Sequence, residues 1–251
     1  MEQQHYQYQD PNVIVLEEGS VSKKFFANVF LWMFVALSLS AVAAWLFGTN
    51  PELLQYLLIQ KANGAIGPSV FGWIVMLAPL GLVLTMSFGL SRLSYPALLS
   101  LFVLYAVLTG LSLSFIVASF TASSVVVCFV SAAAIFGIMA FLGYTTDVDL
   151  TKFGPILMVG IVGLIIASLI NMFIGSSSFD YVISFLGVAI FTALTAYDVQ
   201  KIKQIGQGIE SNGEEALQID ARKTAIIAAL RLYLDFLNIF LYLLRIFGQR
   251  K

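Results

Sequence analysis

The chain has 251 residues, of which 59% are hydrophobic and 11% are charged, and its formal net charge is −1. An ordinary soluble domain carries about 25% charged residues, so this composition predicts a polytopic membrane protein. A chain with no excess of basic residues excludes nucleic acid as a partner. The single histidine, His5, lies in the polar N-terminal tail, and the single cysteine, Cys128, lies in an apolar run. Together they exclude an intrachain disulfide and a histidine-based metal cluster within the membrane.

The sequence divides into three parts. Residues 1–24 form a polar tail, which we expect in the cytoplasm, residues 25–248 form a transmembrane domain, and residues 249–251 are a short C-terminal tail. A transmembrane helix needs about 20 apolar residues, so the uncharged stretch 93–146 is too long for one crossing and is divided near 119–124. We predict an all-α membrane protein with seven transmembrane helices. The predicted spans are 27–47, 70–90, 96–118, 125–143, 153–174, 181–199 and 224–247.

Two shorter features lie between and within the spans. Asn50-Pro51 predicts a helix start, with Asn50 as the N-cap and Pro51 in the first turn. The helix that begins there, over 51–60, is too short to cross a bilayer and is expected at the interface. The charged stretch 201–223 is expected to be a loop between spans six and seven. Span one repeats small residues at every fourth position, which favours close contact with another helix; these are Ala36, Ser40 and Ala44.

The distribution of basic residues predicts the orientation. If the N-terminus is cytoplasmic, the inner segments hold eight of the 13 Lys and Arg residues and the outer segments hold four. The positive-inside rule therefore favours a cytoplasmic N-terminus and an external C-terminus. The eight inner residues are Lys23, Lys24, Arg92, Lys152, Lys201, Lys203, Arg222 and Lys223. The four outer residues are Lys61, Arg245, Arg250 and Lys251, and Arg231 lies within the membrane.

The seventh span carries its polar residues on one helical face. They follow one another at steps of 3, 4 or 7 residues, whereas the other faces hold Ile, Leu, Ala and Phe. Asp235 is expected roughly 16 Å into the hydrocarbon core. An ionisable side chain at that depth costs roughly 2.5–3.5 kcal/mol even on insertion scales, so it is a candidate functional residue. The residues of this face are Thr224, Arg231, Asp235, Asn238, Tyr242 and Arg245.

Asp198, in the last turns of span six, is expected to approach Asp235 if spans six and seven pack together. Two carboxylates in a medium of low dielectric constant cannot both ionise cheaply, so they would share a proton and could sense pH. The same pair offers hard oxygen ligands for calcium. Arg92, at the end of span two, is a candidate latch that would compete for Asp198. Asn238, on the same face as Asp235, is a candidate modulating residue.

Structural interpretations of the same residues stay open. Asp198 and Arg92 can each be an interfacial charge that ends its helix. Arg231 precedes Asp235 by four residues in the sequence, so the two can form a structural ion pair within one helix.

Three motifs give a resemblance to a known family. GYTTDVDLTKFG at 143–154, TAYDVQKIK at 195–203 and LYLDFLNIFLYLLRIFG at 232–248 resemble the Bax inhibitor-1 family, also called the transmembrane Bax inhibitor motif family, in its bacterial form. The resemblance extends over about 24–248. It implies a seven-helix fold in which the seventh helix is central and wrapped by two three-helix layers. It also implies a pH-sensitive calcium leak in a bacterial plasma membrane.

The resemblance implies roles for individual residues. The family's pH-sensing aspartates on spans six and seven match Asp198 and Asp235, and its latch arginine at the end of span two matches Arg92. Arg231 departs from relatives that carry a small neutral residue there. Its guanidinium would favour ionised Asp235 and oppose proton sharing, so we expect pH sensing at lower pH than in a relative without this arginine. Some bacterial relatives bind a membrane-anchored ATP-dependent protease.

These observations predict a calcium leak gated by an aspartate pair, with the lipid bilayer, calcium and protons as its partners. Calcium is the expected transported ion, with Asp198 and Asp235 as its expected ligands, and no tightly bound cofactor or catalytic activity is expected. The alternative is a non-conducting regulator of a membrane protease. A proton-coupled transporter uses the same carboxylates. An intramembrane aspartyl protease fits less well, because Asp235 follows Leu-Tyr-Leu rather than Gly-x-Gly.

Overall fold

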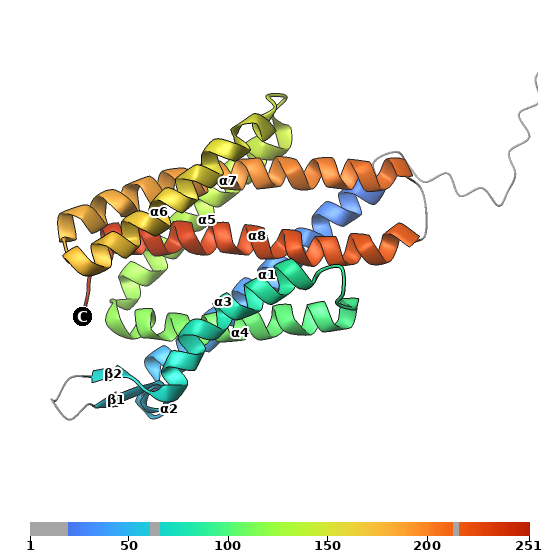
Figure 1. Cartoon of the computed structure of the whole chain (residues 1–251). Helices are drawn as coiled ribbons and strands as arrows, with labels where there is room; N and C mark the ends of the chain where they lie inside the picture. Colours follow the sequence, from blue (N-terminus) through green and yellow to red (C-terminus); the bar gives the residue numbers. More distant parts are fainter. Residues whose placement is uncertain (1–19, 61–65, 213–215) are drawn as a thin grey trace, which may run out of the picture.

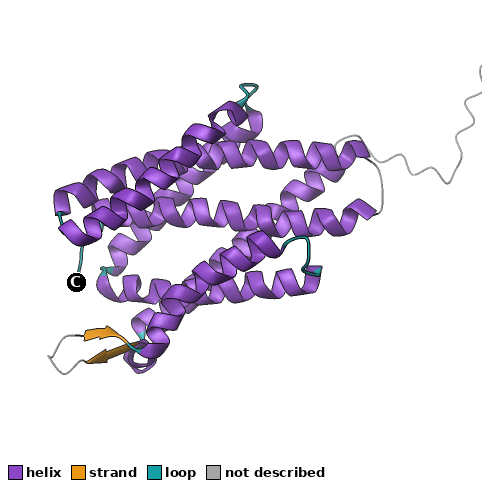
Figure 2. Cartoon of the chain, viewed as in Figure 1, coloured by secondary structure: helices purple, strands orange, loops and turns teal. Residues whose placement is uncertain are grey.

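The structure, a computed structural model, describes residues 20–60, 66–212 and 216–251. Seven of its helices are long and apolar enough to cross a membrane (Figures 1 and 2), which confirms an all-α membrane protein. Residues 1–19 of the predicted tail lie outside the described residues. The described helices are α1 (Ser20–Thr49), α2 (Pro51–Leu57), α3 (Val70–Gly89), α4 (Tyr95–Ser119), α5 (Ala122–Thr145), a 3₁₀ turn η1 (Leu150–Phe153), α6 (Gly154–Ile174), α7 (Ser177–Asn212) and α8 (Ala216–Phe247).

The segment after α1 confirms one prediction and corrects another. The Asn50 side chain accepts a hydrogen bond from the Glu52 N–H at 3.0 Å, so α2 is capped as predicted. The helix predicted over 51–60 is too long, because α2 ends at Leu57. Strand β1 (Leu58–Gln60) then pairs antiparallel with β2 (Ile66–Pro68), as Figure 2 shows at one end of the bundle. Ser69 donates from its N–H to the carbonyl of Leu57 at 2.8 Å, which fixes the return of the chain after the hairpin.

The loop predicted over 201–223 is wrong for most of its length. Helix α7 continues to Asn212 and α8 begins at Ala216. The physical reason is an apolar stripe at helical spacing: Ile202 is buried, and Ile205 and Ile209 pack partly buried against the same core. This stripe supports helix beyond residue 199, the predicted end of span six, despite the polar residues and glycines between its members.

Helix α8 is the most buried of the seven candidate spans. Of the residues in its most apolar segment, 67% are buried inside the protein, against at most 39% in any other candidate span. It packs on α7, α1, α5 and α4, whereas α3 packs on α4 and α6 packs on α7. In Figure 1, α8 (red) runs between α7 and α4. The arrangement of the other helices as two three-helix layers stays a prediction.

Helices α1 and α4 approach closely where small residues meet, as the sequence predicts. Ala36, Ser40 and Ala44 are all buried. Across from them, a Cβ on Gly110 would lie 2.5 Å from the carbonyl oxygen of Ser40. The Ser40 hydroxyl donates to the carbonyl oxygen of Ala106 at 2.7 Å, which joins this side chain of α1 to the backbone of α4. Backbone contact of this kind is possible only where one helix lacks a side chain.

We predict that Gly110→Ala destabilises the protein by about 1–3 kcal/mol, because the added methyl group forces α1 and α4 apart. Thermal unfolding in detergent measures the loss. The matched control is Gly163→Ala on α6, where a Cβ meets no described atom within 4 Å. Equal unfolding temperatures for the two variants would contradict the close contact.

Candidate functional site

Asp198 on α7 and Asp235 on α8 meet inside the bundle. Only 8% of Asp198 and 5% of Asp235 is exposed. Their carboxyl groups are close enough to form a side-chain hydrogen bond. Because an ionised carboxylate can only accept, a hydrogen bond between two carboxyl groups needs a proton on one of them. The structure therefore brings together the two aspartates that the sequence singles out.

When both carboxyl groups are ionised, the buried Oδ2 oxygen of Asp235 accepts no hydrogen bond from the described residues. A buried polar atom without a partner costs about 1–3 kcal/mol, and a charged one costs more. The atom therefore gains free energy from any proton, water molecule or cation that reaches it. A buried acidic pair with an unsatisfied oxygen has the chemistry of a binding or sensing site rather than of a neutral packing contact.

Two cationic side chains influence the pair from a distance. Arg231, one turn before Asp235 on α8, interacts electrostatically with both carboxyl groups, and Lys201 interacts with Asp198. The Arg231 side chain is exposed, and none of the ion pairs formed within the described residues includes it. The structure thus shows no direct ion pair between Arg231 and Asp235. Arg231 acts instead as a nearby positive charge that favours ionised carboxylates.

Arg92 lies in the turn that follows α3 and is exposed. A cavity of about 460 Å³ separates the end of α3 from the start of α8, and it is lined by Ser91, Lys223 and Thr224 among others. No ion pair between Arg92 and Asp198 is formed within the described part of the chain. The structure therefore does not join the candidate latch to the carboxyl pair, and the latch role of Arg92 stays a prediction.

Asn238 lies one turn beyond Asp235 on α8 and is half-buried. Its side-chain amide donates to the carbonyl oxygen of Leu234 at 2.8 Å. This bond occupies the amide nitrogen within its own helix. The proposed modulating role of Asn238 stays a prediction.

Gln200, which follows Asp198 by two residues, has a structural role that the sequence pattern does not predict. This side chain is 6% exposed and binds the connection between α5 and α6 through both ends of its amide. It donates to the carbonyl of Val148 at 2.8 Å and accepts from the N–H of Leu150 at 2.8 Å. Gln200 therefore ties that connection to the turn of α7 that carries Asp198. The sequence feature that could have indicated this role is a neutral amide between the charged residues Asp198 and Lys201.

The motifs at 143–154 and 195–203 pack against each other. Gly143 lies directly on the backbone of Ala196, with no space for a side chain between α5 and α7. A Cβ on Gly154 would lie 2.9 Å from the Tyr197 hydroxyl. These contacts involve the two residues immediately before Asp198 in the chain. The motifs hold the position of this carboxyl group through helix contact rather than through direct bonds to it.

The carboxyl pair alone cannot form a complete calcium cage. Calcium takes 6–8 oxygen ligands. In the described parts of the chain, no group of three or more His, Cys, Asp or Glu side chains is arranged to hold a metal ion. Calcium at Asp198 and Asp235 would need backbone carbonyls or water for most of its ligands. The assignment of these two residues as calcium ligands stays a prediction.

Comparison with known proteins identifies the family. A family model described as "Inhibitor of apoptosis-promoting Bax1" matches residues 22–251. The chain belongs to the Bax inhibitor-1 family. It is 40% identical to the inner membrane protein YbhL of Escherichia coli over 90% of this chain and 92% of the relative. It is also 40% identical to a protein of Borreliella burgdorferi, over 94% and 96% of the two chains.

A membrane protein of Streptococcus pyogenes is 35% identical over 95% of this chain and 98% of the relative. The Bax inhibitor-1 fold of this chain therefore has relatives of nearly the same length in distant bacteria. The name of the Escherichia coli relative assigns that relative to the inner membrane. This agrees with the seven apolar helices of the chain, which make it an integral membrane protein.

We predict that the aspartate pair holds a proton that infrared spectroscopy detects as the carbonyl stretch of a protonated carboxylic acid. Asp235→Asn is expected to remove this band, because the remaining carboxylate keeps its neighbouring cations but loses its acidic partner. The control is Asp180→Asn, which removes the carboxylate that pairs with Arg245 at 3.5 Å. A band that survives in Asp235→Asn and disappears in Asp180→Asn would show that the proton lies elsewhere.

Proposed function

We propose that this Bax inhibitor-1 family protein is a pH-sensitive calcium leak in the membrane and that Asp198 and Asp235 are its proton sensor. The observation that carries the proposal is the pairing of two buried carboxyl groups across the interface of α7 and α8. Helix α8 is also the most buried candidate span, so a change at Asp235 acts on the centre of the packing. The Asp235 oxygen without a partner is destabilising, so binding of a proton or cation to the pair lowers its free energy.

The proton state of the pair changes the force between α7 and α8. With one proton, the carboxyl groups share a hydrogen bond that joins the helices. Without it, two negative charges face each other, and at about 4 Å and an effective dielectric constant of about 20 they repel by about 4 kcal/mol. An energy of this size changes the ratio of two helix arrangements by about a thousand-fold. In the proposed mechanism, Asp198 released from Asp235 becomes available to Arg92.

Calcium suits a pathway that passes such a pair. Carboxylate oxygens are hard ligands that attract a divalent cation, and two of them are too few to retain it as a complete cage would. Two carboxylates therefore attract calcium without binding it tightly, as conduction requires. The Bax inhibitor-1 family resemblance supports the same activity. A non-conducting regulator of a membrane protease is the alternative that the flux experiment separates.

Calcium flux into dye-loaded liposomes tests the proposal from about pH 5 to about pH 8. We expect flux through the wild-type protein to depend on pH. Asp235→Asn and Asp198→Asn should lose most of the pH dependence of the flux, because neither variant retains two acidic groups that can share a proton.

Asp180→Asn serves as the control. It removes a carboxylate of α7 that pairs with α8 away from the site, so this variant should keep the pH dependence of the flux. Absence of calcium flux at every pH, with the protein folded and inserted, overturns the leak and favours the protease-regulator alternative. Saturable exchange of a solute with protons would identify a transporter instead.

We predict that Arg231→Ser moves the midpoint of the pH-dependent flux to higher pH. The guanidinium favours ionised carboxylates, so its removal allows the pair to take up a proton at higher pH. The shift is modest because the side chain is exposed and screened. The matched control is Arg222→Ser, an exposed cation in the first turns of α8. An unchanged midpoint in Arg231→Ser would contradict the electrostatic role of this arginine.

A further inference from the structure

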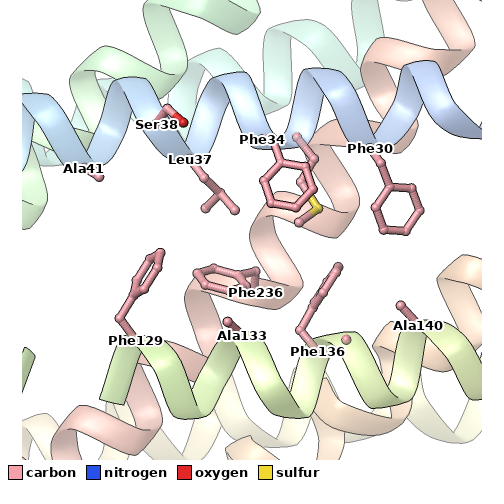
Figure 3. Close-up of a pocket in the computed structure, with 12 residues that line it drawn as sticks. Phe30, Phe34, Leu37, Ser38, Ala41, Phe129, Ala133, Phe136, Ala140 and Phe236 are labelled. Carbon is pink, nitrogen blue, oxygen red and sulfur yellow. The ribbon is translucent and has the colours of Figure 1, made fainter. Parts of the chain in front are cut away.

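An apolar crevice runs between α1 and α5, away from the carboxyl pair. Both helices pack on α8, but within the described residues they make little contact with each other. Figure 3 shows their side chains facing each other across the gap, with Phe34 and Leu37 on α1, Phe129 and Phe136 on α5, and Phe236 of α8 behind them. This part of the crevice has a volume of about 490 Å³, within the usual range for a ligand site.

A second cavity of about 350 Å³ lies next to the first. The two share Leu37, Ala41 and Phe129 in their linings, so they are adjacent along α1. The second cavity extends to Thr49, at the end of α1, and to Lys251. Together the two cavities follow α1 from Phe30 to Thr49, as an extended chain would need.

The two ends of the crevice differ in chemistry. At one end aromatic rings close the gap between α1 and α5, with Phe26 and Tyr144 at 4.8 Å and Phe30 and Phe136 at 6.5 Å between ring centroids. At the other end lies the Lys251 side chain, which lines the cavity. The space is thus apolar, with aromatic rings at one end, and a cation lies at its other end, the outlet.

The cationic end is held in place by the backbone. Thr121 donates to the carbonyl of Gln249 at 2.9 Å, and the N–H of Lys251 donates to the carbonyl of Ser119 at 3.0 Å. These bonds fasten the tail to the connection between α4 and α5. The Arg250 guanidinium lies 5.9 Å from the centre of the Phe120 ring, so a second cation is held at the same connection between α4 and α5.

We propose that the crevice binds one acyl chain of an anionic phospholipid and that Lys251 and Arg250 bind its phosphate. The crevice lies between membrane-spanning helices, so its natural occupant is hydrocarbon from the bilayer. Phe34, Phe129 and Phe136 project into the space from both walls. Cavities of about 490 and 350 Å³ are also far too small for a transmembrane helix, which is about 10 Å across and about 30 Å long. A flexible chain passes between the rings, and two cations at the outlet select a negatively charged headgroup.

Native mass spectrometry of the detergent-purified protein tests this binding with phosphatidylglycerol and with phosphatidylcholine of the same acyl chains. We expect a one-to-one complex with phosphatidylglycerol and about 10-fold weaker binding of phosphatidylcholine. Arg250→Gln combined with Lys251→Gln should make the two affinities equal while binding of phosphatidylcholine is kept.

The crevice itself is tested by Gly137→Phe, which places a ring where a Cβ meets no described atom within 4 Å. It should reduce phosphatidylglycerol binding at least 10-fold, by occupying the volume of the chain. Gly163→Phe on α6 is the matched control, with equally open surroundings among the described residues. Ala133→Leu, on the same wall of the crevice, serves as the second variant if Gly137→Phe does not fold.

Equal affinities of the wild type for the two lipids would overturn the proposal. Unchanged binding by Gly137→Phe and Ala133→Leu, or an equal loss in Gly163→Phe, would also overturn it. The same spectra report the oligomeric state, and a dimer that Gly137→Phe dissociates would show that a second copy of the chain, rather than a lipid, occupies the crevice.

Discussion

The cost of burying two acidic side chains on neighbouring helices is the constraint on which the rest of the structure depends. A carboxylate inside a membrane bundle is tolerated only where packing holds it against a proton or a compensating charge. Here the position of Asp198 is set by contacts that do not involve its own side chain. Gly143 lets α5 lie on the backbone of Ala196, and Gln200 ties the connection between α5 and α6 to the following turn. The residues around the pair thus serve mainly to restrict where α7 can move.

Most of the fold could be predicted from composition and periodicity, because seven long apolar stretches admit few arrangements in a bilayer. The errors had two sources, a local pattern that was concealed and interactions that join distant residues. Polar residues and glycines between Ile202, Ile205 and Ile209 concealed an apolar stripe that continues α7 beyond residue 199. The hairpin after α2 depends on Ser69 binding the end of that helix, and nothing near Leu57 in the chain predicts it. Gln200 was missed for the same reason, since its partners lie about fifty residues earlier in the chain.

The candidate site shows the same limit. Asp198 and Asp235 lie on consecutive helices joined by a short connection, so their approach follows from the antiparallel packing of neighbours in the chain. The position of Arg92 relative to Asp198 cannot be derived in this way, because their helices are not consecutive in the chain. Helix α3 packs on α4 rather than on α7, and the helical spacing of α3 does not reveal which neighbour it chooses. The family resemblance assigns Arg92 a partner that the structure, in this one state, does not place beside it.

The acidic pair and the crevice involve neighbouring residues on different faces of one turn of α8. Asp235 contributes to the pair with α7, and its neighbour Phe236 contacts Phe129 and Phe136 edge to face at 5.1 and 5.8 Å between centroids. Because Phe236 lines the crevice, a movement of this turn that separates the carboxyl groups also changes the space available to an acyl chain. If both proposals hold, proton and lipid binding are linked, and each must alter the affinity for the other by the same factor. The coupling would come from the rigidity of a single helical turn and would need no further residues.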